Sequence, residues 1–211
     1  MNDRSMLEFV RGFIESHDPL GSKLTNRFPF RRLFGHCCRC SVWARRIALA
    51  EGADVEIAEV SALFHDIGKS ADQTAEGHAE VGAGLCENYL TSAGYDAGKR
   101  TQIVGIVRHH IRHAHEPDAS LEAKVESDAD LLDETGAITV LWDAMACAGE
   151  ESPSYEKACD RIARAYEDLK AKSPDCLHTR TARQILAGRL SCMGVFLKNL
   201  EYELGRRETV L

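Results

Sequence analysis

The sequence lacks a long apolar run, because charged residues interrupt every hydrophobic stretch before the ~20 residues that a membrane-spanning helix needs. It also lacks the apolar block of a secretory signal near its start, where Met1 to Arg4 lead into a short amphipathic stretch. With a net charge of -7, it lacks the basic excess expected of a protein that binds duplex nucleic acid. We therefore expect a cytoplasmic protein whose partner is neither a membrane nor duplex nucleic acid.

Disulfide bonds are not expected, although the chain contains eight cysteines. Without a secretory segment, cysteines are expected to be reduced and to pack as small apolar residues. Cys37 and Cys40 have the C-x-x-C spacing of zinc and redox motifs, but the sequence has no second such pair and no βαβ pattern around this one. We interpret the pair as part of a packed helix surface.

The sequence also lacks the apolar and polar alternation of β-strands, and its periodicity is helical nearly throughout. With 211 residues, of which 44% are hydrophobic, it can bury one sizeable core, so we predict an all-α, single-domain helical bundle. Residues 1–30 would form an N-terminal helix and lead-in, residues 31–148 the functional core, and residues 149–211 C-terminal helices packed on it. Apolar stripes predict helices around residues 7–14, 36–50, 57–64, 78–89, 103–110, 121–132, 138–145, 154–172 and 182–204, with Gly52 ending the second and Pro153 and Pro174 between the last ones.

His65 and Asp66 lie side by side where an apolar helical run changes into a turn. An imidazole nitrogen and a carboxylate oxygen that reach one point suit a borderline divalent ion such as zinc, manganese or iron. One such pair is weak by itself, but His36 precedes it, and further histidines and aspartates follow on successive predicted helices. Because side chains from several helices of a bundle can point into one cavity, we predict a metal site built from these residues and one later carboxylate.

Two carboxylates, Asp128 and Asp130, are candidates for that last ligand, and helix phase slightly favours Asp128. The order of His36, His65-Asp66 and a later aspartate along the chain resembles the HD-domain metal-dependent phosphohydrolases, whose signature is a histidine, a His-Asp pair and a distant aspartate. The segment Ala129-Asp130-Leu131-Leu132-Asp133 is similar to the Ala-Asp-x-x-Asp context of the last ligand in that family. From about His36 onward the chain looks like the small stand-alone bacterial members, some of which are similar to nucleotide pyrophosphohydrolases. The resemblance implies that the metal ligands are His36, His65, Asp66 and Asp130, with Asp128 as a supporting neighbour.

A second metal ion is implied by a further part of the resemblance. The run from His65 to Lys69, then His78 and the pair His109-His110, resembles the subset of the family with two or more metals. In that subset the aspartate of the pair bridges the ions, so Asp66 would bridge, and His78 with one or both of His109 and His110 would hold the second ion. The alternative is that these histidines only begin and end helices, where an imidazole interacts with the helix dipole. The Gly-Tyr-Pro extension typical of cyclic dinucleotide phosphodiesterases is missing after His110, which argues against that substrate.

A divalent ion with open coordination positions activates water and polarises a phosphoryl oxygen, so hydrolysis of a phosphoester or phosphoanhydride is the expected reaction. Lys69 or an arginine would stabilise the developing negative charge. Asp133, one turn beyond Asp130, would orient the site or handle a proton, unless it is only a solvated carboxylate.

Two other functions are compatible with the same ligands. Some proteins that resemble this fold are di-iron oxygenases, which would consume oxygen and release no phosphate. A non-catalytic signalling or binding module is the other alternative, but degenerate modules usually lack ligands that this chain retains.

The substrate class is suggested by a segment without acidic residues, from Pro19 to Ala50, in an otherwise acidic chain. Arg27, Arg31 and Arg32 lie just before the helix of His36, and arginine binds phosphate oxygens bidentately. We therefore expect nucleotides or similar phosphorylated small molecules as substrates, with di- or triphosphates preferred. A homodimer is compatible with the sequence.

Overall fold

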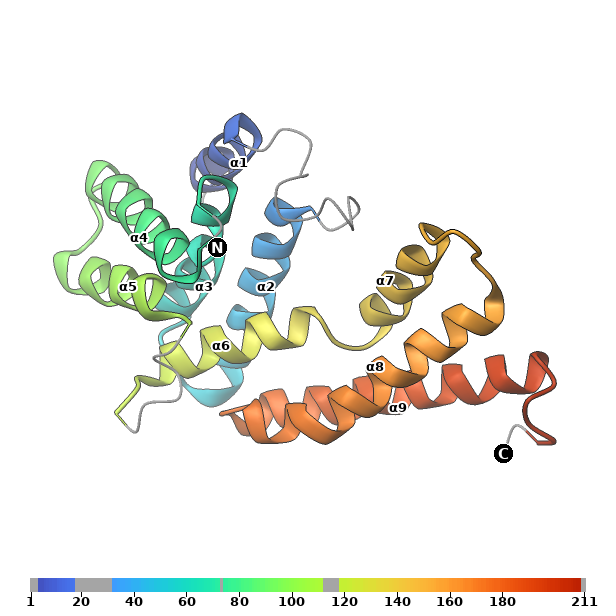
Figure 1. The fold of residues 1–211 in the computed structure, drawn as a ribbon. Coiled ribbons are helices and arrows are strands. Elements are labelled where there is room, and N and C mark those ends of the chain that lie inside the picture. The colour runs from blue at the N-terminus through green and yellow to red at the C-terminus, as the bar shows by residue number, and fades with distance from the viewer. Residues whose placement is uncertain (1–3, 18–31, 73, 112–117, 210–211) are drawn as a thin grey trace. The chain divides into compact units, whose positions relative to one another are not determined.

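The computed structural model describes residues 4–17, 32–72, 74–111 and 118–209. All regular structure in these ranges is helical, with no strand, which confirms the all-α prediction (Figure 1). The chain divides into two compact units, Met1–Asp133 and Glu134–Leu211, and each is described by itself. Within the described part of the chain, none of the helices combines the length and apolar character that a membrane crossing needs.

The first unit contains the helices that carry the predicted metal ligands. α2 packs against α3 and α6, α3 also packs against α5 and α6, and α4 packs against α5 and the short 3-10 helix η1. The elements are α1 (Arg4–His17), α2 (Leu33–Glu51), α3 (Val55–Phe64), η1 (Ile67–Ser70), α4 (Ala75–Ser92), α5 (Ala97–His109) and α6 (Leu121–Asp133).

α3 is the central helix of this unit, and its residues are buried from Ile57 to Phe64. Leu63 and Phe64 are fully buried in the main hydrophobic cluster, where each contributes about 1.5–3 kcal/mol. At the start of α3, the Asp54 carboxylate accepts hydrogen bonds from two backbone amides of the first turn. A rigid, buried α3 therefore delivers the residues that follow it, His65 and Asp66, to a defined place.

The turn between α2 and α3 depends on Gly52, which ends α2 as predicted. Its φ of 78° is left-handed, a conformation that costs glycine little because it has no Cβ. This turn reverses the chain so that α2 and α3 pack side by side.

The second unit contains α7 (Ala137–Ala148), α8 (Tyr155–Cys176) and α9 (Arg180–Glu203), which pack on one another. Its small core includes Cys159, Ile162 and Leu197. The prediction that Pro174 separates helices is wrong, because α8 continues to Cys176. A proline this near the C-terminal end removes a backbone donor but leaves little helix to disrupt. The division after Asp133 falls inside the predicted 31–148 core, and the predicted boundaries and single domain stay predictions.

Candidate metal centre

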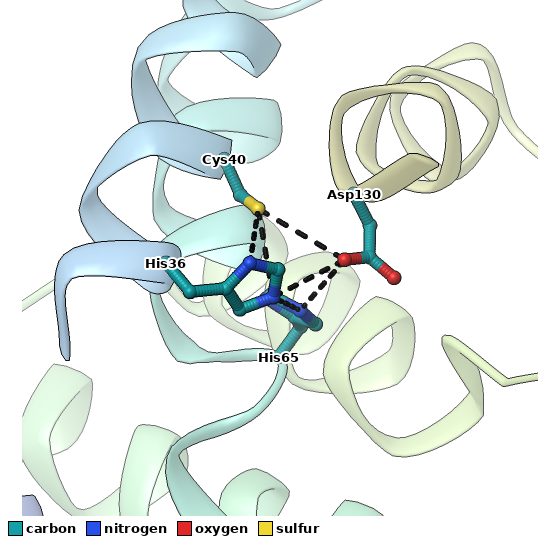
Figure 2. Close-up of side chains that lie close together, drawn as sticks. All are labelled: His36, Cys40, His65 and Asp130. Atoms are coloured by element: carbon teal, nitrogen blue, oxygen red, sulfur yellow. Dashed lines mark hydrogen bonds and ion pairs between the residues drawn. The ribbon is translucent and has the colours of Figure 1, made fainter. Parts of the chain in front are cut away.

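Four side chains from two helices, α2 and α6, and from the turn after α3 converge on a point beside the end of α3. They form the first donor set, which consists of His36, Cys40, His65 and Asp130 (Figure 2). The Nε2 atoms of His36 and His65 lie 3.3 Å apart. Asp130 Oδ1 lies 3.2 Å from His36 Nε2 and 3.6 Å from His65 Nε2. These separations match ligand atoms around one metal ion, since donors at about 2.0–2.3 Å from tetrahedral zinc lie roughly 3.3–3.8 Å apart.

A second donor set, Asp66, His78 and His110, lies directly beside the first. The Nε2 atoms of His78 and His110 are 3.2 Å apart, and Asp66 Oδ1 lies 3.6 and 3.5 Å from them. The other oxygen of this carboxylate, Oδ2, lies 3.5 Å from His36 Nε2 and 3.4 Å from His65 Nε2. Asp66 therefore presents one oxygen to each donor set, as a bridging ligand would.

The histidine rings are held with their Nε2 atoms toward the centre. Nδ1 of His65, His78 and His110 lies 2.8 Å from a backbone carbonyl oxygen, that of Ala62, Thr74 and Val107 respectively. A carbonyl only accepts, so each Nδ1 carries a proton, and in the neutral form of each ring the Nε2 lone pair points inward. Lone pairs of paired Nε2 atoms would then face each other and Asp66, whose Oδ1 is buried without a hydrogen-bond partner in the described residues. A cation at each set would satisfy these groups, so the residues present fit divalent metal ions.

His36 is oriented differently, by a carboxylate. Asp133 Oδ2 accepts a hydrogen bond from His36 Nδ1 at 2.9 Å, and both oxygens of Asp133 accept from Arg39, at 2.7 and 2.9 Å. Asp133 is buried, while the side chain of Arg39 is 42% exposed. This carboxylate–histidine arrangement fixes the tautomer and the ring plane of a metal-binding imidazole.

The carboxylates give the first donor set a strongly negative electrostatic potential. Burial alone would lower the pKa of His36 and His65, but carboxylates outweigh it and hold both pKa values well above normal. They are Asp130, Asp133 and Asp66 around His36, and Asp66 and Asp130 around His65. Burial would raise the pKa of Asp66, yet the histidines around it keep it well below its usual value. The first set thus attracts positive charge, and a divalent ion would compete with protons for the same nitrogens.

Polar groups with partial exposure border the buried donors. Asp130 has a side chain that is 43% exposed, whereas those of His36, His65 and Asp66 are nearly inaccessible. Lys69, one turn beyond Asp66, places its ammonium nitrogen 2.5 Å from Asp66 Oδ2, and its side chain is 28% exposed. Solvent therefore reaches the donor sets on the side of Asp130 and Lys69.

The spacing between the sets depends on a backbone contact of Gly68. A Cβ atom at this position would lie 2.0 Å from the carbonyl oxygen of His78 and 2.9 Å from the amide nitrogen of Gly82. Only glycine lets η1 approach α4 this closely. The contact holds the chain after Asp66 against the helix that carries His78.

Some predicted site residues do not join the donor sets. Asp128 is buried on α6 but belongs to neither set, since its neighbour Asp130 faces the first one. His109 is exposed, and its Nδ1 lies 3.0 Å from the Gly105 carbonyl of its own helix, so only His110 reaches the second set. Arg32 is exposed at the N-cap of α2, and Arg27 and Arg31 lie outside the described residues.

Three residues near the donors were not predicted from the sequence as part of the site. Cys40 lies one turn after His36 on the same face, a helical spacing that could have indicated it. Glu126 lies one turn before Asp130 and is buried with an unpartnered Oε1, 4.0 Å from His65 Nδ1. The partnership of Arg39 with Asp133 joins helices 94 residues apart in sequence, so no local pattern indicates it.

Comparisons with known proteins agree with this geometry. The model of the HD domain family matches residues 33–135, which contain the whole first donor set and Asp66, His78 and His110. A solved hydrolase of the HD superfamily from an uncultured Thermotogales bacterium is 26% identical, with a TM-score of 0.67 over 96% of this chain and 92% of that one. Bacillus subtilis YpgQ is 22% identical and shares the fold, with a TM-score of 0.61 over 97% and 98% of the two chains. Residues 33–135 of the chain therefore form an HD domain, and the chain resembles a solved hydrolase of the HD superfamily.

The chain is also similar to parts of curated proteins that are much longer than it is. Ribonuclease Y of Sulfurovum is 28% identical over 163 residues, and that of Thermus thermophilus is 31% identical over 175 residues. These matches cover 74% and 79% of this chain but only 30% and 26% of the relatives. The chain thus spans less than a third of their length.

Proposed function

We propose that this protein is a metal-dependent phosphohydrolase that acts on a nucleotide or another phosphorylated small molecule. The proposal rests on the position of the Asp66 carboxylate, whose two oxygens each face one of the two histidine-containing donor sets. His36, His65, Asp66 and Asp130 would hold the first ion, and Asp66, His78 and His110 the second. When bound, such ions lower the pKa of water and polarise a phosphoryl oxygen.

The protein's own side chains would orient the metal ligands and stabilise the negative charge that develops in this reaction. Asp133, itself held by Arg39, keeps His36 in the orientation that presents Nε2 to the site. Lys69 stands beside Asp66 at the accessible side, where its ammonium would stabilise negative phosphoryl oxygens. In hydrolysis the water oxygen bonds to phosphorus as the leaving P–O bond breaks, and the leaving oxygen takes a proton. Solvent beside Asp130, whose side chain is 43% exposed, would accept the proton that the water loses and supply the one that the leaving oxygen takes.

A substrate with more than one phosphate agrees with the basic segment that precedes α2. Arg32 at the N-cap of α2 is exposed, and Arg27 and Arg31 precede it in the sequence. Bacillus subtilis YpgQ, which has the same fold, has been solved in complex with ADP. We propose that these arginines bind the distal phosphates of a nucleoside di- or triphosphate.

A panel of substrates tests the reaction class. Protein stripped with a chelator and reloaded with manganese or iron should release phosphate or pyrophosphate from nucleoside di- and triphosphates, and the stripped protein should not. Oxygen uptake with ferrous iron and no phosphate release would instead establish an oxygenase. Turnover that persists in the stripped protein would refute metal dependence.

The arginines are tested by a double substitution, Arg31→Ala with Arg32→Ala. Loss of one or two charge-assisted contacts should raise KM for the polyphosphate about tenfold or more. The pair Arg4→Ala and Arg46→Ala is a matched control, since it removes the same charge from two exposed positions on α1 and α2. An unchanged KM in the first pair would exclude this role.

Cleavage of RNA is a second candidate, favoured by the similarity to ribonucleases Y. The same donor sets would serve a phosphodiester, although the net charge of -7 disfavours a long polyanion. A labelled single-stranded RNA in the substrate panel distinguishes the candidates, because its cleavage in preference to nucleotides would replace the small-molecule proposal.

A further inference from the structure

Cys40 adds a soft donor to a site that otherwise offers only nitrogen and oxygen. Its Sγ lies 3.6 and 3.7 Å from the two ring nitrogens of His36 and 4.0 Å from Asp130 Oδ1. Figure 2 shows the sulfur projecting from α2 toward the gap between the His36 ring and Asp130. Cys40 is fully buried, so the thiol is enclosed among these groups and not on the surface.

The separations in the first donor set correspond to a four-coordinate ion. In a tetrahedral zinc site, nitrogen and oxygen ligands lie roughly 3.3–3.5 Å apart, and a thiolate lies about 3.5–3.7 Å from each of them. The nitrogen and oxygen atoms of His36, His65 and Asp130 are 3.2–3.6 Å apart, and the sulfur lies 3.7 Å from His36 Nε2. The sulfur lies 4.0 Å from Asp130 Oδ1 and within 4.8 Å of the His65 donor, and a small side-chain movement would shorten both separations.

Asp66 Oδ2 competes with this sulfur for the same ion. It lies 3.5 and 3.4 Å from the Nε2 atoms of His36 and His65, which is equally suitable for coordination. Hard ions such as manganese prefer carboxylate oxygen, whereas zinc and cobalt accept thiolate readily. Which donor completes the site therefore depends on the metal.

We propose that Cys40 is a metal-selective ligand, which completes a closed tetrahedral site with His36, His65 and Asp130 for zinc-like ions and remains uncoordinated with manganese. Four protein ligands leave zinc without an open position for water, which is the pattern of a structural and not a catalytic site. Zinc bound in this way would hold the enzyme inactive. The inference rests on the proposed function, because it assumes that the first donor set binds a metal.

Cobalt(II) is the probe that tests it, with the full-length chain stripped of metal. Cobalt should produce a near-ultraviolet thiolate-to-cobalt charge-transfer band in the wild type, and Cys40→Ala should lose it. Cys37→Ala is the matched control, because Cys37 is also fully buried on α2 but packs in the hydrophobic core, and it should keep the band. Zinc affinity of Cys40→Ala should fall at least about tenfold, since even indirect partners of a ligand cost that much.

The outcomes separate the two proposals. Wild-type protein that binds cobalt without a thiolate band would overturn the role of Cys40 and leave the metal site intact. Wild-type protein that binds no cobalt, manganese or zinc would refute the proposed function itself. If Cys40→Ala fails to fold, X-ray absorption at the zinc edge of the wild type decides directly, because a bound thiolate gives a sulfur neighbour at about 2.3 Å. A first shell of nitrogen and oxygen alone would then exclude Cys40.

Discussion

The two donor sets around Asp66 differ in charge although they share one carboxylate. The first set has Asp130 and Asp66 facing two histidines, and these carboxylates hold the pKa of His36 and His65 well above normal. The second set has only Asp66 Oδ1 for its histidines, and burial leaves the pKa of His78 below its ordinary value. A divalent ion should therefore bind more tightly at the first set. An ion at the second set would depend mainly on Asp66 Oδ1 for a negatively charged ligand.

Removal of Asp66 should weaken the binding of manganese at both donor sets, because each set faces one oxygen of this carboxylate. In Asp66→Ala we expect turnover to fall on the order of a thousandfold or more, because metal activation of water is worth several kcal/mol. Metal content should fall with it, while the helical circular dichroism persists. Asp160→Ala, an exposed carboxylate on α8, is the control and should retain both. Full activity of Asp66→Ala after chelator treatment would contradict the metal mechanism.

Substitution of Glu126, which lies beside His65 of the first donor set, should change how the stability of the metal-free protein depends on pH. Burial raises the pKa of this carboxyl from 4.5 to about 7, so its ionisation is costlier in the folded state than in the unfolded one. The folded protein then binds more protons between these two values, and its stability falls as pH rises from about 4.5 to 7. Glu126→Gln should remove this loss and gain up to roughly 3 kcal/mol at pH 8, with no gain at pH 4.

Denaturant unfolding of the stripped protein at the two pH values measures this effect. Glu87→Gln, an exposed glutamate on α4, is the matched control and should leave the stability difference unchanged. A Glu126→Gln protein whose stability falls with pH as steeply as that of the wild type would show that Glu126 is not the group responsible.

Substitution of Gly68 should affect the two donor sets unequally, because this residue sets the distance between η1 and α4. Gly68→Ala forces a Cβ against the His78 carbonyl, and such overpacking costs about 1–3 kcal/mol in the free energy of unfolding. The displaced backbone should also weaken the second ion more than the first. Gly84→Ala, with open space around its Cβ on α4, should instead stabilise the helix by about 0.5–1 kcal/mol. Equal loss of both ions in Gly68→Ala would show that this contact does not position the second set.

The sequence was sufficient for the parts of the site that local patterns determine. The all-α class follows from helical periodicity, and the resemblance to HD domains orders His36, His65, Asp66 and Asp130 along the chain. Helix phase, by contrast, favoured Asp128, because the apolar stripe of α6 identifies the buried face but not the point where that face meets the other helices. The choice between His109 and His110 has the same cause, since consecutive residues at a helix end point about 100° apart. Cys40 was read only as half of a C-x-x-C pair, although its spacing from His36 placed it on the ligand face.

Tertiary partners outside any local pattern could not be predicted. Asp133 was expected to orient the site, handle a proton or be merely solvated, and its bonds to His36 and Arg39 depend on how α2 and α6 pack. No local pattern distinguishes Glu126 from other glutamates of α6, because its burial beside His65 depends on how the helices pack.

Metal stoichiometry tests the shared role of Asp66 most directly. Stripped protein is reloaded with manganese or ferrous iron, and bound metal is counted per chain for the wild type and His78→Ala, with His109→Ala as the neighbouring control. We expect about two ions in the wild type and in His109→Ala, and about one in His78→Ala. A wild type that binds only one ion with every metal, or a His78→Ala protein that still binds two, would contradict a two-ion centre bridged by Asp66.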